Sequence, residues 1–233
     1  MENNLKYKIF FFINLKKFTI IVLDEFDKVI LKKELSLKSS SEKFDFVLFD
    51  ALINQNIFKI EKELNEFINI IYLIIDYDDI FSINLSIKNK VNNVFLNNEL
   101  INNLLIEAKS CCKETLENAT VMHMTIDQFY IDNYVYKTLP KNIRCENLCV
   151  DLNFVCIPNN FLQNFEKIFK KYRISIGRTL SYRYVNNFIE ISSKDLGSVS
   201  KKILSGFNEN EVILTNKLPK NVGFFEKFFN FFN

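Results

Sequence analysis

Residues 7–37 read YKIFFFINLKKFTIIVLDEFDKVILKKELSL. Three apolar runs of strand length are separated by two short polar connections, at 14–17 and 24–27. Apolar runs of this length, joined by connections this short, are typical of strands that pair with their neighbours. The opening of the chain therefore predicts a three-stranded β-meander.

The stretch that follows predicts a helix and another strand. A polar segment at 39–43 is expected to be a linker, and an apolar run starts at residue 44. Between 57 and 70 the apolar residues recur at the spacing of one helical face. Residues 70–75 then read IIYLII, which indicates a buried strand.

Residues 78–157 predict an inserted α+β module of about 80 residues, which is a normal size for a small domain. Residues 81–87 alternate apolar and polar side chains, as a half-buried strand does. Asn97 is expected to cap a helix over 97–110. Two longer strands are predicted at 119–132 and 147–157, and Pro158 closes the module.

The remaining pattern predicts a helix, a strand and then a second meander. In order, these elements are expected at 161–172, 174–176, 187–191, 198–204 and 211–215. A meander, an inserted module, a helix and strand, and a second meander together are similar to the duplicated ribonuclease-H-like core of the actin and Hsp70 ATPases. The similarity is one of element order.

Composition excludes several classes of function. Of 233 residues, 48% are hydrophobic and 25% charged, which is typical of a globular protein. The net charge of +2 and only four arginines argue against a nucleic-acid partner. No run of 18 apolar residues and no signal peptide is found, so a cytoplasmic location is expected. Five cysteines without repeated spacing predict reduced thiols, and with a single histidine they predict no metal site.

Two further groups of residues receive structural interpretations. His123 is the only histidine, and we expect its ring to donate a hydrogen bond to a strand backbone rather than to take part in catalysis. The acidic run Asp76-Tyr77-Asp78-Asp79 concentrates carboxylates that could attract a cation. It lacks the spacing and the glycine of an EF-hand, so a turn after the strand is the preferred interpretation.

Residues 122–132, MHMTIDQFYID, resemble a stretch of the bacterial actin-like cell-division proteins of the FtsA family. His123, Phe129, Ile131 and Asp132 match that family's pattern, whereas Ile126 stands where the family has proline. A second resembling block is PKNIRCENLCVD at 140–151, in which Pro140, Leu148, Val150 and Asp151 match and Asn142, Ile143 and Cys145 depart. Residues 161–184 follow as the family's next helix and strand, so the resemblance spans about half of the chain, from residue 70 to 184.

The resemblance implies an α/β fold with an actin-like (ribonuclease-H-like) first domain, an inserted small α+β subdomain and a truncated second domain. Residues 78–157 would be the subdomain called 1C, which serves the family in polymer contacts and partner docking. The implied division of the chain is 1–77 and 158–185 for the actin-like domain, 186–217 for a shortened second-domain β-meander and 218–233 for a tail.

The phosphate-binding hairpins of the actin-like family are degenerate in this chain. Those hairpins hold ATP phosphates with glycine amides, and an Asp organises Mg²⁺. The first position reads Asn14-Leu15-Lys16-Lys17, without Asp or Gly, and the second reads Glu190-Ile191-Ser192-Ser193-Lys194-Asp195, without Gly. A Cβ at such a position obstructs the close approach of a phosphate. The expected outcome is no cofactor and no enzymatic activity.

The last ten residues, FFEKFFNFFN at 224–233, follow PKNVG at 219–223. On a helix the apolar residues cover about half of the circumference. The predicted membrane-binding residues are Val222, Phe224, Phe225, Lys227, Phe228, Phe229, Phe231 and Phe232. From the residues alone, a helix that folds back on the core is an equal alternative. The resemblance implies a membrane-seeking helix, because FtsA ends in a short amphipathic helix on the inner membrane.

The expected function is a non-enzymatic scaffold or tether in bacterial cell division, peripheral on the inner face of the cell membrane at the septum. Self-association through the actin-like and 1C-like modules is expected. FtsZ is a weaker expectation, since the half that grips FtsZ in the family is mostly absent from this sequence. Two alternatives stay open. One is an ATPase that retains atypical ATP and Mg binding, and the other is an adaptor like PilM that docks a peptide of a membrane protein.

Overall fold

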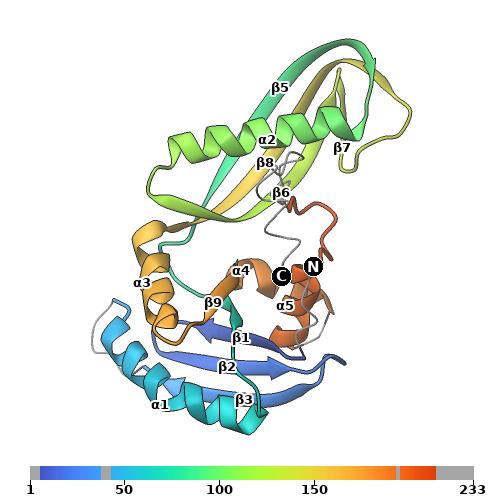
Figure 1. The fold of residues 1–233 in the computed structure, drawn as a ribbon. Coiled ribbons are helices and arrows are strands. Elements are labelled where there is room, and N and C mark those ends of the chain that lie inside the picture. The colour runs from blue at the N-terminus through green and yellow to red at the C-terminus, as the bar shows by residue number, and fades with distance from the viewer. Residues whose placement is uncertain (1–5, 38–42, 193–194, 214–233) are drawn as a thin grey trace, which may run out of the picture.

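The computed structural model describes residues 6–37, 43–192 and 195–213, which form two β-sheets and five helices (Figure 1). The first sheet has the strand order β3-β2-β1-β4-β9. Its strands are β1 (Lys8–Ile13), β2 (Lys17–Leu23), β3 (Val29–Ser36), β4 (Ile70–Ile75) and β9 (Ser175–Ser181).

The first sheet combines an antiparallel and a parallel half. β1, β2 and β3 form the predicted antiparallel meander, whereas β4 pairs parallel to β1 and β9 pairs parallel to β4. An antiparallel meander continued by two parallel strands is the arrangement of a ribonuclease-H-like sheet. The predicted mixed α/β fold class is thereby confirmed.

Helices cover both faces of the first sheet (Figure 1). On one face lie α1 (Phe46–Leu64) and α3 (Asn159–Lys170), and on the other lie α4 (Tyr182–Ser192) and α5 (Leu196–Leu204). Successive residues of a strand point to opposite faces, so the run of phenylalanines in β1 supplies both cores. Phe11 packs with Phe49 and Phe165 under α1 and α3, whereas Phe10 packs under α4 and α5.

The second sheet takes its strands from one continuous stretch of chain. Its order is β5-β8-β6-β7. The strands are β5 (Phe81–Phe95), β6 (Ala119–Ile131), β7 (Tyr134–Tyr136) and β8 (Arg144–Pro158). Helix α2 (Asn98–Thr115) covers one face, and the opposite face is polar, with Asp151 accepting from Ser86 Oγ at 2.6 Å. The Asn97 side chain caps α2 by accepting from the Leu100 amide, as its residue type predicts.

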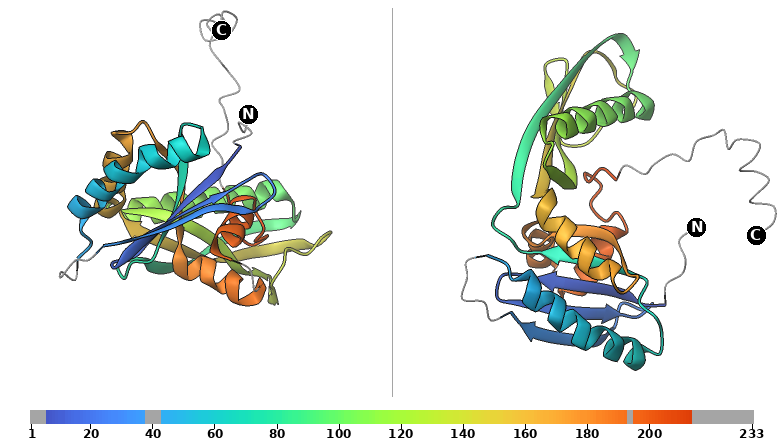
Figure 2. Two further views of the ribbon diagram at one scale, coloured as in Figure 1. Left: turned by 90° about the horizontal axis from the view of Figure 1, so that it is seen from below. Right: turned by 60° about the vertical axis from the view of Figure 1, so that its left-hand side comes forward.

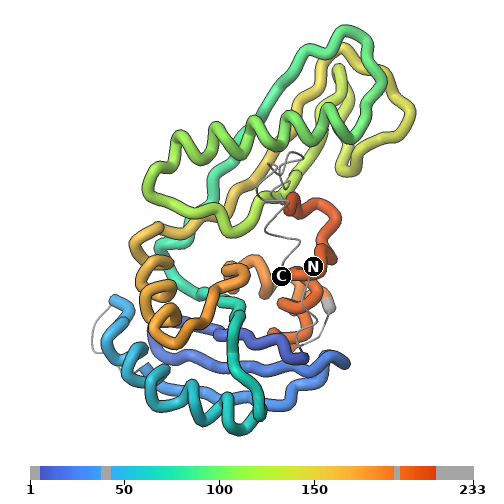
Figure 3. The backbone as a smooth tube through the Cα atoms, in the orientation of Figure 1, coloured from blue at the N-terminus to red at the C-terminus, as the bar shows by residue number. Residues whose placement is uncertain are grey.

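Two connections join the sheets (Figure 2, Figure 3). The chain passes from β4 into β5 and returns from β8 through α3 to β9. Separately, residues 205–213 run from α5 back to β6, where Ile126 N donates to Asn210 O and Val212 N donates to Met124 O, both at 2.8 Å. This C-terminal segment therefore extends the second sheet along the part of β6 that β7 leaves open.

The predicted second meander is wrong, because 187–191 and 198–204 lie in the helices α4 and α5. Tyr182, Val185 and Ile189 share one face of α4 at helical spacing, and Asp195 caps α5 by accepting from the Ser198 amide at 3.1 Å. At 211–213 only a single bridge, Thr125 to Glu211, is formed within the described part of the chain. The predicted tail at 218–233 lies outside the described residues.

Other boundaries differ for local reasons. α1 begins at Phe46 rather than near residue 57, because Asp45 caps it by accepting from the Leu48 amide at 2.9 Å. It ends at Leu64, where Asn65 adopts φ 51°. β5 continues past its predicted end at Ile87 to Phe95, and the short hairpin strand β7 has no counterpart among the predicted elements.

We predict that Phe165→Ala lowers the free energy of unfolding by about 3–5 kcal/mol, as measured by urea denaturation. Phe165 is fully buried, and its ring contacts those of Phe44, Phe46, Phe49 and Phe161. The matched control is Phe67→Ala, since Phe67 is 80% exposed and its truncation should change stability by less than about 0.5 kcal/mol. Equal losses in the two variants would contradict the placement of α3 over the first sheet.

Candidate functional site

The carboxyl ends of the parallel strands β1, β4 and β9 meet at one edge of the first sheet. Ligands of open α/β sheets bind at this kind of edge. Three segments leave the strands there, at 14–17, 76–80 and 181–183. The groups that these segments present decide whether a phosphate or a metal could be held.

The hairpin after β1 uses its amides internally. Asn14 Oδ1 accepts from the backbone amides of Lys16 at 3.0 Å and of Lys17 at 2.9 Å, and Asn14 N donates to Lys17 O at 3.0 Å. Lys17 Nζ pairs with Glu34 at 2.8 Å, and Leu15 packs against the core under α1. The two amides that could face a phosphate are therefore already bonded to the side chain of Asn14.

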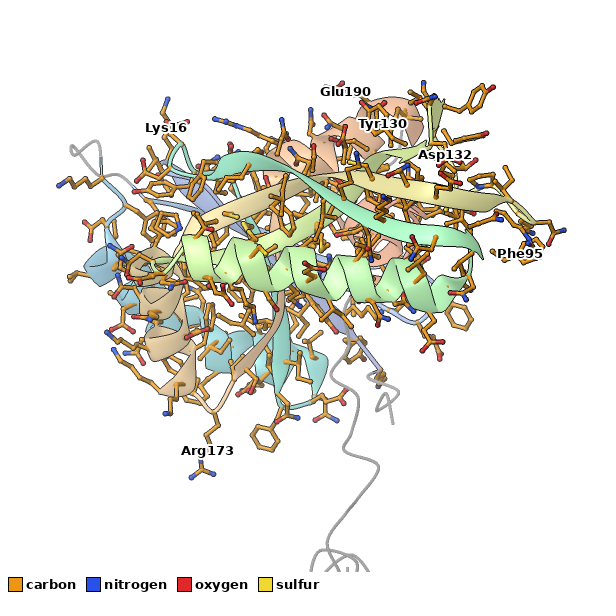
Figure 4. All side chains as sticks on the ribbon, turned by 90° about the horizontal axis from the view of Figure 1, so that it is seen from above. Lys16, Phe95, Tyr130, Asp132, Arg173 and Glu190 are labelled. Carbon is orange, nitrogen blue, oxygen red and sulfur yellow. The ribbon has the colours of Figure 1, made fainter. Side chains whose placement is uncertain are left out.

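The second predicted phosphate hairpin is wrong as a structure. Glu190 and Ser192 lie in the last turns of α4, and Ser193 and Lys194 fall outside the described residues. Glu190 accepts from Asn186 Nδ2 one turn earlier, at 2.7 Å. Figure 4 shows Lys16 and Glu190 apart, whereas Lys17 of the first segment and Asp195 of the second line one groove of about 280 Å³.

The acidic segment after β4 forms a turn. Asp76 N donates to Ile13 O at 2.8 Å, and Ile80 N donates to Tyr77 O at 3.2 Å. Burial raises the pKa of the Asp76 carboxyl, and the charge of Arg183 opposes that effect. Within the described part of the chain, no three His, Cys, Asp or Glu side chains are grouped as metal ligands.

A groove of about 470 Å³ runs between the polar face of the second sheet and α4. Asp127 and Arg183 supply charges to it, and Phe188 and Ile191 of α4 supply apolar surface. Burial and the neighbouring charge of Asp151 raise the pKa of Asp127. The groove is thus lined by an acid, a base and two apolar side chains.

Beside this groove a buried polar cluster joins the two sheets. His123 of β6 accepts at Nε2 from the Ser181 amide of β9 at 2.9 Å. A ring nitrogen that accepts carries no proton, so Nδ1 is protonated and donates to Glu211 Oε1 at 2.8 Å. The expectation that the ring donates to a strand backbone is wrong in direction, because the ring accepts from the backbone and donates to a carboxylate.

Arg178 and Tyr184 complete the cluster. The Arg178 guanidinium also donates to Glu211 Oε1, and the Tyr184 ring stacks on His123 with a centroid distance of 3.9 Å. Glu211 Oε2 is buried and has no hydrogen-bond partner among the described residues. Burial lowers the pKa of His123. Burial acts to raise the pKa of Glu211, but the His123 hydrogen bond and the Arg178 charge hold it below its usual value.

Little in the sequence points to this cluster. His123 stands out as the only histidine, but Glu211 lies 88 residues further along and resembles any exposed acid in a turn. Arg178 is one of four arginines and has no predicted role. The contacts arise only because the C-terminal segment returns to β6.

The residues that carry the family resemblance have structural positions. Phe129 and Ile131 point into the core under α2. Asp132 adopts φ 53° in the turn after β6, and its carboxylate accepts from the amides of Glu146 and Asn147 at 3.0 and 2.9 Å. These contacts support the hairpin and present no catalytic group.

A scan against models of known protein families finds no match for the sequence, and a search of curated proteins finds none either. Among solved structures, the chain is similar to the cytoplasmic domain of EpsL, an inner membrane component of the type II secretion system of Vibrio cholerae. That similarity has 12% identity and a TM-score of 0.33, and covers 75% of this chain and 55% of the cytoplasmic-domain structure.

The chain is also similar to a Bacteroides thetaiotaomicron protein with an actin-like ATPase fold and unknown function. Here identity is 11% and the TM-score 0.35, with 80% of this chain and 57% of the other covered. The chain spans a little over half the length of both structures. Among the helices of the described residues, none combines the length and the hydrophobicity of a membrane-spanning helix.

We predict that the free energy of unfolding falls as the pH drops below 6.5. The pKa of His123 is lower in the folded than in the unfolded protein, so the folded state binds fewer protons in this range. The neutral His123 therefore contributes its full stabilisation above pH 6.5. Below pH 6.5 the free energy of unfolding decreases by at most about 1.4 kcal/mol per pH unit, until the pH reaches the lowered pKa of His123.

The control for this pH dependence is His123→Gln, which keeps a donor and an acceptor but does not titrate. It retains the carboxyl groups of the wild type, so the difference between the two curves of unfolding free energy isolates His123. Parallel curves between about pH 6.5 and 5.5 would contradict the buried neutral histidine.

Proposed function

We propose that this protein is a non-enzymatic scaffold that tethers a protein assembly to the inner face of the bacterial membrane. The observation that carries the proposal is the hairpin after β1, where Asn14 Oδ1 occupies the amides of Lys16 and Lys17. A hairpin whose amides are satisfied by its own side chain gains nothing from a phosphate. In this proposal the first sheet supports surfaces that bind partners, and it takes no part in nucleotide chemistry.

The resemblance of residues 122–132 and 140–151 to the FtsA family supports bacterial cell division as the setting. In this proposal the tail at 218–233 binds the inner membrane and the second sheet mediates self-association. In the FtsA family, FtsZ binds to the half of the protein that is mostly absent from this sequence. FtsZ is therefore a partner only if another surface of this chain binds it.

The groove beside α4 favours a second candidate, an adaptor that docks a peptide of a membrane protein. Asp127 and Arg183 would bind charges of an extended peptide, and Phe188 and Ile191 would hold its apolar side chains. In this candidate the membrane contact comes from the partner and the Phe-rich tail is dispensable.

We predict that Mg-ATP does not raise the melting temperature. A ligand present at a hundred times its Kd stabilises a protein by about 2.7 kcal/mol, which shifts the melting temperature by several degrees. Thermal unfolding with and without millimolar Mg-ATP measures this. A rise of several degrees that the double variant Lys16→Ala, Lys17→Ala abolishes would restore the ATPase alternative.

We predict that the full chain floats with liposomes, whereas residues 1–217 and the variant Phe228→Glu remain at the bottom of the gradient. A glutamate at position 228, in the middle of the Phe-rich tail, opposes insertion of the tail into the membrane interface. Phe67→Glu is the matched control, since Phe67 is 80% exposed on the folded part of the chain. If all variants behave alike, the tail is not the anchor and the adaptor candidate takes its place.

A further inference from the structure

A row of aromatic rings leads from the buried cluster to the surface. Tyr184 stacks on His123, Phe188 lies 5.2 Å from Tyr184, and Phe207 lies 6.2 Å from Phe188, between ring centroids. The row starts at a fully buried histidine and ends at Phe207, which is 57% exposed. An exposed ring that is supported from behind by other rings holds its position at the surface.

Phe207 belongs to a group of exposed apolar side chains, which we call the C-terminal apolar patch and define as Ile191, Phe207 and Ile213. Ile191 is 81% exposed and Ile213 is 47% exposed. The Ile213 side chain lies 4.0 Å from where a side chain on Gly206 would begin, beside Phe207. Ile191 follows Phe188 by three residues on α4, so both lie on the same side of that helix.

The described chain ends inside this patch, at Ile213, and the Phe-rich tail follows. From Ile213 to Val222 there are about nine residue steps, which span at most about 30 Å. A tail bound to a bilayer would hold the patch at a high effective concentration near that same surface. A small apolar contact is then enough to orient the folded domain.

We propose that the C-terminal apolar patch rests on the lipid bilayer and fixes the orientation of the folded domain when the tail is bound. This inference rests on the proposed tether function and adds the face that meets the membrane. Phenylalanine and isoleucine side chains enter the boundary between headgroups and acyl chains, as they do in interfacial helices.

The charges around the patch fit a nearly neutral lipid surface. Lys202 lies over the Phe207 ring, with its Nζ 5.5 Å from the ring centroid, and Glu209 is an exposed acid two residues after Phe207. Lys201 is engaged by Asp27 on the β2–β3 connection. Glu190, which precedes Ile191, is a second exposed acid, so apolar contact rather than attraction to anionic lipid sets the orientation.

Because the chain contains no tryptophan, a single indole introduced by substitution reports its own surroundings. The test uses two full-length variants, Phe207→Trp and the matched control Phe67→Trp, with vesicles of phosphatidylcholine and brominated phosphatidylcholine. Brominated acyl chains quench only indole rings that reach the interface. We expect the Phe207→Trp variant to lose at least half of its emission on brominated vesicles, and the Phe67→Trp variant to lose almost none.

Flotation of the double variant Phe207→Glu, Ile213→Glu supplies the second measurement, and partitioning about five times weaker than that of the wild type is expected. If the wild type floats and the Phe207→Trp indole is not quenched, the patch faces away from lipid and the inference is overturned, while the tether survives. If the emission of that indole responds to protein concentration and not to lipid, a second copy covers the patch, which also overturns it. If the wild type does not float, the tether fails first, and the inference fails with it.

Discussion

The carboxylate of Glu211 forms a buried polar link between the two sheets. It accepts from His123 of the second sheet and from Arg178 of the first, and it is brought there by the C-terminal segment. A buried charge that loses a partner remains unsolvated, which costs free energy. Separating Glu211 from His123 or from Arg178 is therefore unfavourable. The cluster therefore connects both sheets to the C-terminal segment that carries Glu211.

The hairpin after β1 is also held by a side-chain oxygen, that of Asn14. The backbone of that hairpin still turns tightly at the carboxyl edge of the parallel strands. Asn14 supplies from within the hairpin the oxygen that a phosphate would otherwise supply. The shape of the hairpin is therefore supported by hydrogen bonds of its own side chain, without glycine.

Much of the fold can be predicted because its signals are local. The runs 7–13, 18–23 and 70–75 are apolar over the length of a strand, and Asn97 caps α2 as its residue type suggests. After residue 182 the prediction is wrong because the apolar residues are few and closely spaced, which suits a short strand and a short helix equally. There the caps decide, and the Asp195 cap of α5 is the signal that the strand pattern hides. The buried cluster cannot be predicted, since its partners are brought together by the return of the C-terminal segment.

The return of the C-terminal segment to β6 connects the groove beside α4 with the C-terminal apolar patch. Residues 205–213 pair with β6 and place Glu211 between the two sheets. They also place Phe207 and Ile213 at the surface. The groove beside α4 is lined by Asn208 and Asn210 of the same segment. The groove, the contacts of Glu211 and the C-terminal apolar patch therefore share one short stretch of backbone.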